Sequence, residues 1–229
     1  MVDLFNEVSE DLRRDRLNRF WARFGVYIIA LAVLVVLATA GWRGWEYWRG
    51  QQAAAAADRY LDAVQLAETG DHAAAAEAFA AIAADAPSGY AVLAKFRRAA
   101  ELAAGGDGAA ALEAYSALAS DGGLSSGQRD LARLRGAMIA VDDEDHAAFK
   151  DRLAPLLADG NPWKAAASEL LAVSAIRAEQ WQEARDTLSA LVAADDTPGD
   201  LRSRAEILLT VVVGRIGPAE DAEKEGSGS

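Results

Sequence analysis

Two segments of the chain repeat one pattern: G-D-H-A-A-A-A-E-A-F-A-A-I at residues 70–82, and G-D-G-A-A-A-L-E-A-Y-S-A-L at residues 106–118. More divergent copies start at Glu144 and Glu179, so that the four starts are 36, 38 and 35 residues apart. A repeat of this length is typical of helical hairpins that stack on one another. The pattern therefore predicts a helical solenoid.

Certain positions in each copy keep the same kind of residue. Nine residues after the start stands a large apolar residue, and the four are Phe79, Tyr115, Leu153 and Leu188. Three residues further on stand Ile82, Leu118, Leu156 and Leu191. Seven residues before the start the residue is always Ala, at Ala63, Ala99, Ala137 and Ala172. A second small position holds Ala75, Ala111 and Ala184, with Phe149 as the exception. We expect the small residues to let the two helices of a hairpin approach closely, while the large residues fill the gap to the next hairpin.

The pattern G-D-x-x-x-A-x-x-x-F-x-x-I, closed by Pro87, resembles the second half of a tetratricopeptide repeat. That family has small residues at the positions of Ala63, Ala75, Ala99 and Ala111, and an aromatic residue at those of Phe79 and Tyr115. The aromatic-leucine pairing that the family usually has in its first helix is weak in this chain. The resemblance implies an all-α fold built as a tetratricopeptide-like solenoid.

One long stretch without charge, residues 24–42, precedes the repeats and reads F-G-V-Y-I-I-A-L-A-V-L-V-V-L-A-T-A-G-W. As a helix, its 19 residues would span roughly 28 Å, close to the thickness of a bilayer's hydrocarbon core. Aromatic residues stand at both ends, and those expected at the membrane interface are Trp21, Trp42, Trp45, Tyr47 and Trp48. The stretch therefore predicts a transmembrane helix that contacts the lipid bilayer.

The distribution of Arg predicts the orientation of this helix. Five Arg residues precede it, at positions 13, 14, 16, 19 and 23, whereas Arg43, Arg49 and Arg59 follow it over a similar distance. The positive-inside rule then places residues 1–23 in the cytoplasm and the C-terminal part across the membrane, which in a bacterium is the periplasm. We expect an uncleaved signal anchor, although Ala38-Thr39-Ala40 is similar to a signal-peptidase site and a cleaved signal peptide is the alternative.

The layout of the whole chain resembles the YfgM-like family of bacterial inner-membrane proteins, which carry a periplasmic repeat domain. The resemblance rests on the N-terminal tail, the single apolar stretch, the run G-W-R-G-W-E-Y-W from Gly41, the degenerate repeats, and the segment S-G-Y-A-V-L-A from Ser88. It implies association with the SecYEG translocon, and handover of emerging or unfolded polypeptides to periplasmic chaperones.

The repeat domain is expected to cover residues 43–217, with a last helix from about Asp200 to Ile216 that caps the stack. Gly217-Pro218 would end this helix, and residues 218–229 read as an acidic disordered tail.

Composition excludes several kinds of chemistry. The chain has no Cys and only two His, His72 and His146, so disulfides, a thiolate nucleophile, thiolate-bound zinc and a site with several His ligands are excluded. A net charge of −12 argues against nucleic acid as a partner. The run Asp142 to Asp145 lacks the alternating ligands and the Gly of a calcium loop, and no phosphate-binding Gly loop is present. The sequence thus predicts no catalytic residue, cofactor, metal or small-molecule substrate.

A stacked array offers instead a surface lined by the first helix of each hairpin. Two columns of residues lie one helical turn apart on that face: Tyr60, Phe96, Leu134 and Glu169 in one, and Val64, Ala100, Met138 and Val173 in the other. These mostly apolar columns predict a groove for a polypeptide, and interhelix core is the other interpretation of the same residues.

The hypothesis that follows is a membrane-anchored periplasmic protein-interaction module, ancillary to the translocon and the chaperone network. The alternative is an assembly scaffold in envelope biogenesis or cell division that acts through self-association.

Overall fold

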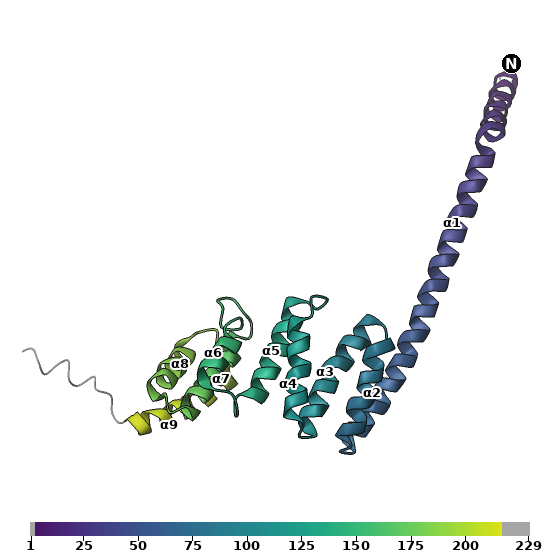
Figure 1. Cartoon of the computed structure of the whole chain (residues 1–229). Helices are drawn as coiled ribbons and strands as arrows, with labels where there is room; N and C mark the ends of the chain where they lie inside the picture. Colours follow the sequence, from purple (N-terminus) through teal and green to yellow (C-terminus); the bar gives the residue numbers. More distant parts are fainter. Residues whose placement is uncertain (1–2, 217–229) are drawn as a thin grey trace, which may run out of the picture. The chain divides into compact units, whose positions relative to one another are not determined.

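The computed structural model describes the backbone of residues 3–216, and the side chains of residues 21–216 except Ile28 and Ser88. These residues form nine α-helices and no strand (Figure 1), which confirms the predicted all-α class. The helices are α1 (Asp3–Glu68), α2 (His72–Asp85), α3 (Ser88–Ala104), α4 (Gly108–Ser120), α5 (Ser126–Ala140), α6 (His146–Leu153), α7 (Lys164–Arg177), α8 (Trp181–Ala193) and α9 (Gly199–Ile216). The acidic tail predicted for residues 218–229 lies outside the described residues.

The chain divides into two compact units, with the boundary between Ala55 and Ala56. The first unit consists of the N-terminal part of α1, and the predicted span, residues 24–42, lies wholly within this helix. From Trp21 onward α1 is long and apolar enough to cross a membrane, by length and composition.

The second unit is the array of hairpins. Its pairs are the end of α1 with α2, α3 with α4, α5 with α6, and α7 with α8, and α9 packs on the last pair. In Figure 1, α2 to α5 follow one another in chain order, and α6 to α9 form the other end of the array. Among the described residues, contacts between elements join neighbours in the chain or the first helices of adjacent pairs. This is the packing of a solenoid, in which each unit touches only the next.

The turns inside the hairpins form where the repeated pattern starts. Gly70 and Gly106 have φ of 84° and 87°, a left-handed conformation that Gly adopts without steric cost. The next residue caps the following helix: the Asp71 carboxylate accepts a hydrogen bond from the Ala74 N–H at 3.1 Å, and Asp107 does the same from Ala110 at 3.0 Å. The Gly-Asp pair that the two copies share therefore ends one helix and begins the next.

Small residues lie where the helices cross. The four repeated alanines, Ala63, Ala99, Ala137 and Ala172, are fully buried, and so are Ala75, Ala111 and Ala184. A methyl group at these places lets two backbones approach, and the large residues Phe79, Leu153 and Leu188 fill the space around them.

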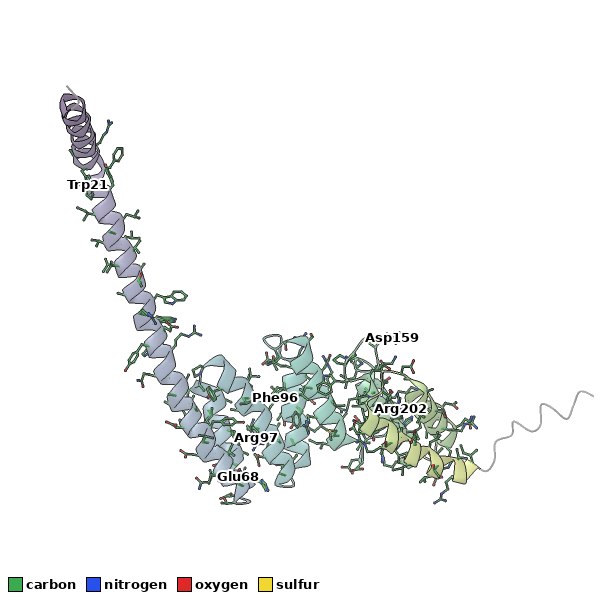
Figure 2. All side chains as sticks on the ribbon, turned by 180° about the vertical axis from the view of Figure 1, so that it is seen from behind. Trp21, Glu68, Phe96, Arg97, Asp159 and Arg202 are labelled. Carbon is green, nitrogen blue, oxygen red and sulfur yellow. The ribbon has the colours of Figure 1, made fainter. Side chains whose placement is uncertain are left out.

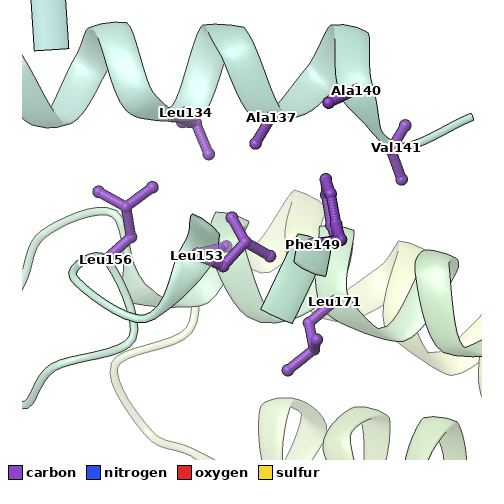
Figure 3. Packing of buried hydrophobic residues seen from close by; sticks show 9 residues of the cluster. Leu134, Ala137, Ala140, Val141, Phe149, Leu153, Leu156 and Leu171 are labelled. Carbon is purple, nitrogen blue, oxygen red and sulfur yellow. The ribbon is translucent and has the colours of Figure 1, made fainter. Parts of the chain in front are cut away.

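The third hairpin differs from the others because its second helix is short. Helix α6 ends at Leu153, and Pro155, which has no N–H to donate, follows after the C-cap residue Ala154. Phe149 takes the place of the small residue and is fully buried against α5, where Ala137 and Ala140 leave room for its ring (Figure 3). Leu156 lies beyond the helix but is still buried in the same cluster. A bulky residue in the second helix is thus matched by small residues in the first.

Candidate functional site

The aromatic residues of the predicted columns form the outer edge of the core. The Tyr60 ring lies 5.1 Å from that of Phe79 in an edge-to-face arrangement and 6.2 Å from that of Tyr90. In the second hairpin, the centre of the Phe96 ring lies 6.4 Å from that of the Tyr115 ring. Both column residues are half-buried, so one side of each ring packs inward and the rest is open to solvent. These rings serve as core and as surface at once.

The third and fourth hairpins present different residues at the same positions. Leu134 is 7% exposed and belongs to the core, whereas Met138, one turn later on α5, is 50% exposed. Glu169 forms a bidentate ion pair with Arg204 of α9, with Nε–Oε1 and Nη2–Oε2 distances of 2.7 and 2.9 Å. The smaller residues Val64, Ala100 and Val173 are half-buried. The face is therefore apolar over the first three hairpins and closed by an ion pair at the fourth.

Two large apolar residues that the columns did not include lie beside them. Leu61 is 64% exposed next to Tyr60, and Leu93 is 49% exposed one helical turn before Phe96. Helical spacing from the column residues, at i+1 and i−3, is the signal that could have found them. With Met138 they are the large apolar side chains that this face offers to a partner.

Helix α9 continues both columns. Its Ala205 is fully buried, as are Ala94, Ala132 and Ala167 of α3, α5 and α7. In these three helices, the column residues stand two and six positions after the alanine in the sequence. Two and six positions after Ala205 stand Ile207 and Val211, which are both exposed. The alignment of the four repeats on their turns did not include these two residues, because no further turn motif follows α9.

An arginine that is paired with a glutamate lies beside the aromatic part of the face. The Arg97 guanidinium, beside Phe96 on α3 (Figure 2), lies 5.7 Å from the Phe79 ring and 3.3 Å from Glu101. Burial raises the pKa of Tyr60, and Glu101 adds to this while Arg97 opposes it. Burial also raises the pKa of Tyr115, which keeps both phenols neutral in the physiological range.

We name the surface formed by Tyr60, Leu61, Val64, Leu93, Phe96, Ala100 and Met138 the first-helix face.

The residues predicted for the membrane interface are all exposed on α1. Trp21 (Figure 2) stands before the apolar stretch, and Trp42, Trp45, Tyr47 and Trp48 follow it, with the Trp45 and Trp48 rings 5.4 Å apart. Inside the stretch, the Thr39 hydroxyl donates to the Val35 carbonyl at 2.7 Å, so that its polar group is satisfied within the helix.

A family model described as a tetratricopeptide repeat-like domain matches residues 18–199. The match covers the apolar stretch of α1 together with all four hairpins, and ends where α9 begins. The chain belongs to the tetratricopeptide repeat-like family. No curated protein shows a significant match to it.

Domains of the tetratricopeptide repeat-like family are typically protein-binding modules without catalytic activity, and the chain's most reactive side chains have structural partners. His146 Nδ1 lies 3.0 Å from the Ser174 hydroxyl, and its Nε2 lies 3.3 Å from Glu183 Oε2, a grouping with the residue types of a hydrolytic triad. Ser174 is fully buried, however, so its hydroxyl has no access to a substrate. Lys150 and then His146 hold the pKa of Glu183 below its usual range. The group joins α6 to α7 and α8.

The other His and the acidic run have comparable roles. His72 Nδ1 lies 2.9 Å from Glu101 Oε2, which joins α2 to the following hairpin. In the acidic run, the Asp145 carboxylate accepts a hydrogen bond from the Ala147 N–H and caps α6. Glu144 holds Arg152 with two contacts, at 2.7 and 2.8 Å. These side chains stabilise helix ends and helix contacts.

Proposed function

We propose that the chain is a membrane-anchored protein-interaction module that binds polypeptide on its first-helix face, on the periplasmic side of a bacterial inner membrane. The observation that supports this most directly is the exposure of Leu61, Leu93 and Met138 on this face, the first two beside half-buried rings. Single exposed apolar residues are ordinary, but several on one face of adjacent helices mark an interaction surface. The apolar stretch 24–42 provides the anchor.

Such a module needs only modest affinity. Anchoring confines it to the membrane, which raises its effective concentration near any partner in that membrane. A helix or extended segment can lay apolar side chains against the first-helix face, and an uncharged contact of this kind tolerates many sequences. We therefore propose that emerging or unfolded polypeptides are the clients.

The translocon assignment rests on the layout of the chain. An N-terminal anchor, aromatic residues at both ends of it, and degenerate repeats up to α9 resemble the YfgM-like family, and the family match extends into the apolar stretch. We propose accordingly that the chain is ancillary to SecYEG and passes clients to periplasmic chaperones, with the N-terminus in the cytoplasm.

Site-specific photocrosslinking in the intact anchored protein tests this function. We place the crosslinking residue at Leu93 or Met138, and at Glu113 as the control, an exposed position on α4 outside the face. Antibodies to the translocon subunits and to periplasmic chaperones then identify the products. We expect products from positions 93 and 138 only, and fewer from position 93 when Met138→Lys is added.

Equal products from position 113 would contradict the role of the face. Products no different from those of an unrelated single-span protein would contradict the function itself.

Self-association is a second candidate function, and helix α9 favours it. Helix α9 exposes Ile207, Val211 and Val213, although it is the last helix of the described array, where an exposed polar surface is usual. A second copy packed on this helix would cover them, as an assembly scaffold requires.

A further inference from the structure

A pocket of about 360 Å³ lies between the first two hairpins, away from the first-helix face. The lining is apolar at depth, where Leu118 of α4 is buried and Ala80, Ala83 and Ala114 are half-buried, while the exposed Ala84 and Ala117 lie at its opening. The hollow exists because both second helices carry methyl groups at positions where a longer side chain would fill it. Its volume lies in the range of sites that accept a large side chain or a small ligand.

Cations from α3 stand at the rim of this pocket. Lys95 Nζ lies 3.2 Å from Asp121 Oδ2 and is neutralised by it. The second cation, Arg98, is exposed and forms no ion pair or hydrogen bond with any of the residues whose side chains the structure describes. The lining therefore has one uncompensated positive charge, in a chain whose net charge is −12.

The pocket and the first-helix face use opposite sides of α3. Phe96 and Ala100 are one turn apart on the face, and the helical period of 3.6 residues turns Lys95 and Arg98 to the other side. A molecule bound in the pocket would leave the first-helix face free.

We propose that this pocket is a second docking site, and that its occupant is a polypeptide segment with a large apolar side chain next to a carboxylate. The apolar part of the lining takes the side chain, and Arg98 pairs with the carboxylate through a charge-assisted hydrogen bond. A polypeptide fits better than a small ligand because the polar groups of the lining stand at the rim, where they can pair with neighbouring residues of a chain. The net negative charge of the protein opposes binding of such a segment in general, and Arg98 supplies a local attraction at this pocket.

Two fluorescein-labelled peptides of 12 residues test the site. One has a central Leu-Leu pair flanked by four Glu, with Gly and Ser elsewhere, and its twin has Lys in place of Glu. Fluorescence anisotropy is measured against the full chain in nanodiscs of uncharged lipid. We expect the acidic peptide to bind, and the basic twin to bind about two- to fivefold more weakly, as expected for loss of one exposed ion pair.

Two variants and their matched controls locate the binding. Arg98→Glu should reverse the preference between the peptides, whereas Arg135→Glu, at an exposed Arg of α5, should leave it unchanged. Ala84→Trp fills the pocket from an exposed position and should abolish binding, whereas Ala73→Trp on the same helix should not. Circular dichroism checks that each variant keeps its helix content.

Each other outcome overturns the proposal: no binding of the acidic peptide, equal binding of both peptides, or binding that survives Ala84→Trp. Loss of binding on Met138→Lys with Ala84→Trp unaffected would assign the peptide to the first-helix face instead. That result would support the function proposed for the face while contradicting the second site.

Discussion

Glu179 carries the turn of the fourth hairpin in a conformation that suits Gly. Its φ is 58°, close to the left-handed region in which Gly70 and Gly106 hold the equivalent turns of the first two hairpins. For a residue with a Cβ atom, this region costs about 1–2 kcal/mol. The fourth hairpin therefore keeps the geometry of the others at a local energetic cost.

Replacing Glu179 by Gly should stabilise the protein. We expect the free energy of unfolding to rise by about 1 kcal/mol, because relief of the left-handed strain exceeds the extra flexibility of Gly in the unfolded chain. Urea denaturation followed by circular dichroism measures the change. Glu206→Gly is the matched control, since this exposed position in the interior of α9 should lose about 1 kcal/mol instead. A loss of stability in both variants would contradict the interpretation of the turn.

In three of the four hairpins, the residue two places after the turn start joins one hairpin to the next, while the second hairpin has Gly108 there. His72 and His146 contact Glu101 and Ser174 of the following first helices, and in the fourth hairpin Trp181 lies 5.8 Å from the Arg215 guanidinium of α9. The repeat places His72, His146 and Trp181 at one equivalent position and predicts that they pack between hairpins, but it does not identify their partners. These partners lie about 30 residues away, and no local pattern specifies them.

At the scale of single elements, helix α1 joins segments that the sequence described separately. The segment before the apolar stretch, the stretch itself and the first helix of the first hairpin all fall within Asp3–Glu68. Gly41, Gly44 and Gly50 lie in this helix and do not break it. An isolated Gly lowers helix propensity by about 1 kcal/mol relative to Ala but does not end a helix unless a turn follows.

The orientation of α1 can be tested with single cysteines, because the natural sequence has none. We expect a membrane-impermeant maleimide to label Ser116→Cys, an exposed site on α4, in intact bacterial spheroplasts. Ser9→Cys, before the apolar stretch, should react only after permeabilisation. Labelling in the reverse order would place the repeats in the cytoplasm. A product that lacks the first 40 residues would show cleavage after Ala40 and the absence of an anchor.

At the scale of the whole molecule, native mass distinguishes the two candidate functions. A scaffold requires oligomers of the full chain, and Ile207→Lys should dissociate them, because it places a charge at the exposed apolar side of α9. Native mass spectrometry of the detergent-solubilised protein reports the oligomeric state, and Glu206→Lys, beside the apolar side, is the control. A monomer at all accessible concentrations would remove self-association from consideration.

Much of the molecule follows from its repeated pattern, because the pattern concerns contacts within a hairpin and with the next one. Fixed spacing was enough to predict the stacked hairpins, and the buried alanines lie at the predicted crossings. The surface could not be predicted equally well. Leu134 and Met138 differ by one turn on α5, yet only the packing of Leu153 and Leu156 decides that Leu134 is buried and Met138 exposed. Likewise, Glu169 is neutralised by a residue of α9 that no repeat predicts.

The restriction of contacts to adjacent helices has a consequence for how the chain acquires its structure during synthesis. A protein whose ends must meet cannot fold until its last residue has been delivered, whereas here the first hairpin has nearly all its partners once α3 is present. Local contacts of this kind cost little loop entropy and form rapidly. A chain delivered N-terminus first can therefore fold one hairpin at a time, with little apolar surface waiting for residues that have not yet arrived.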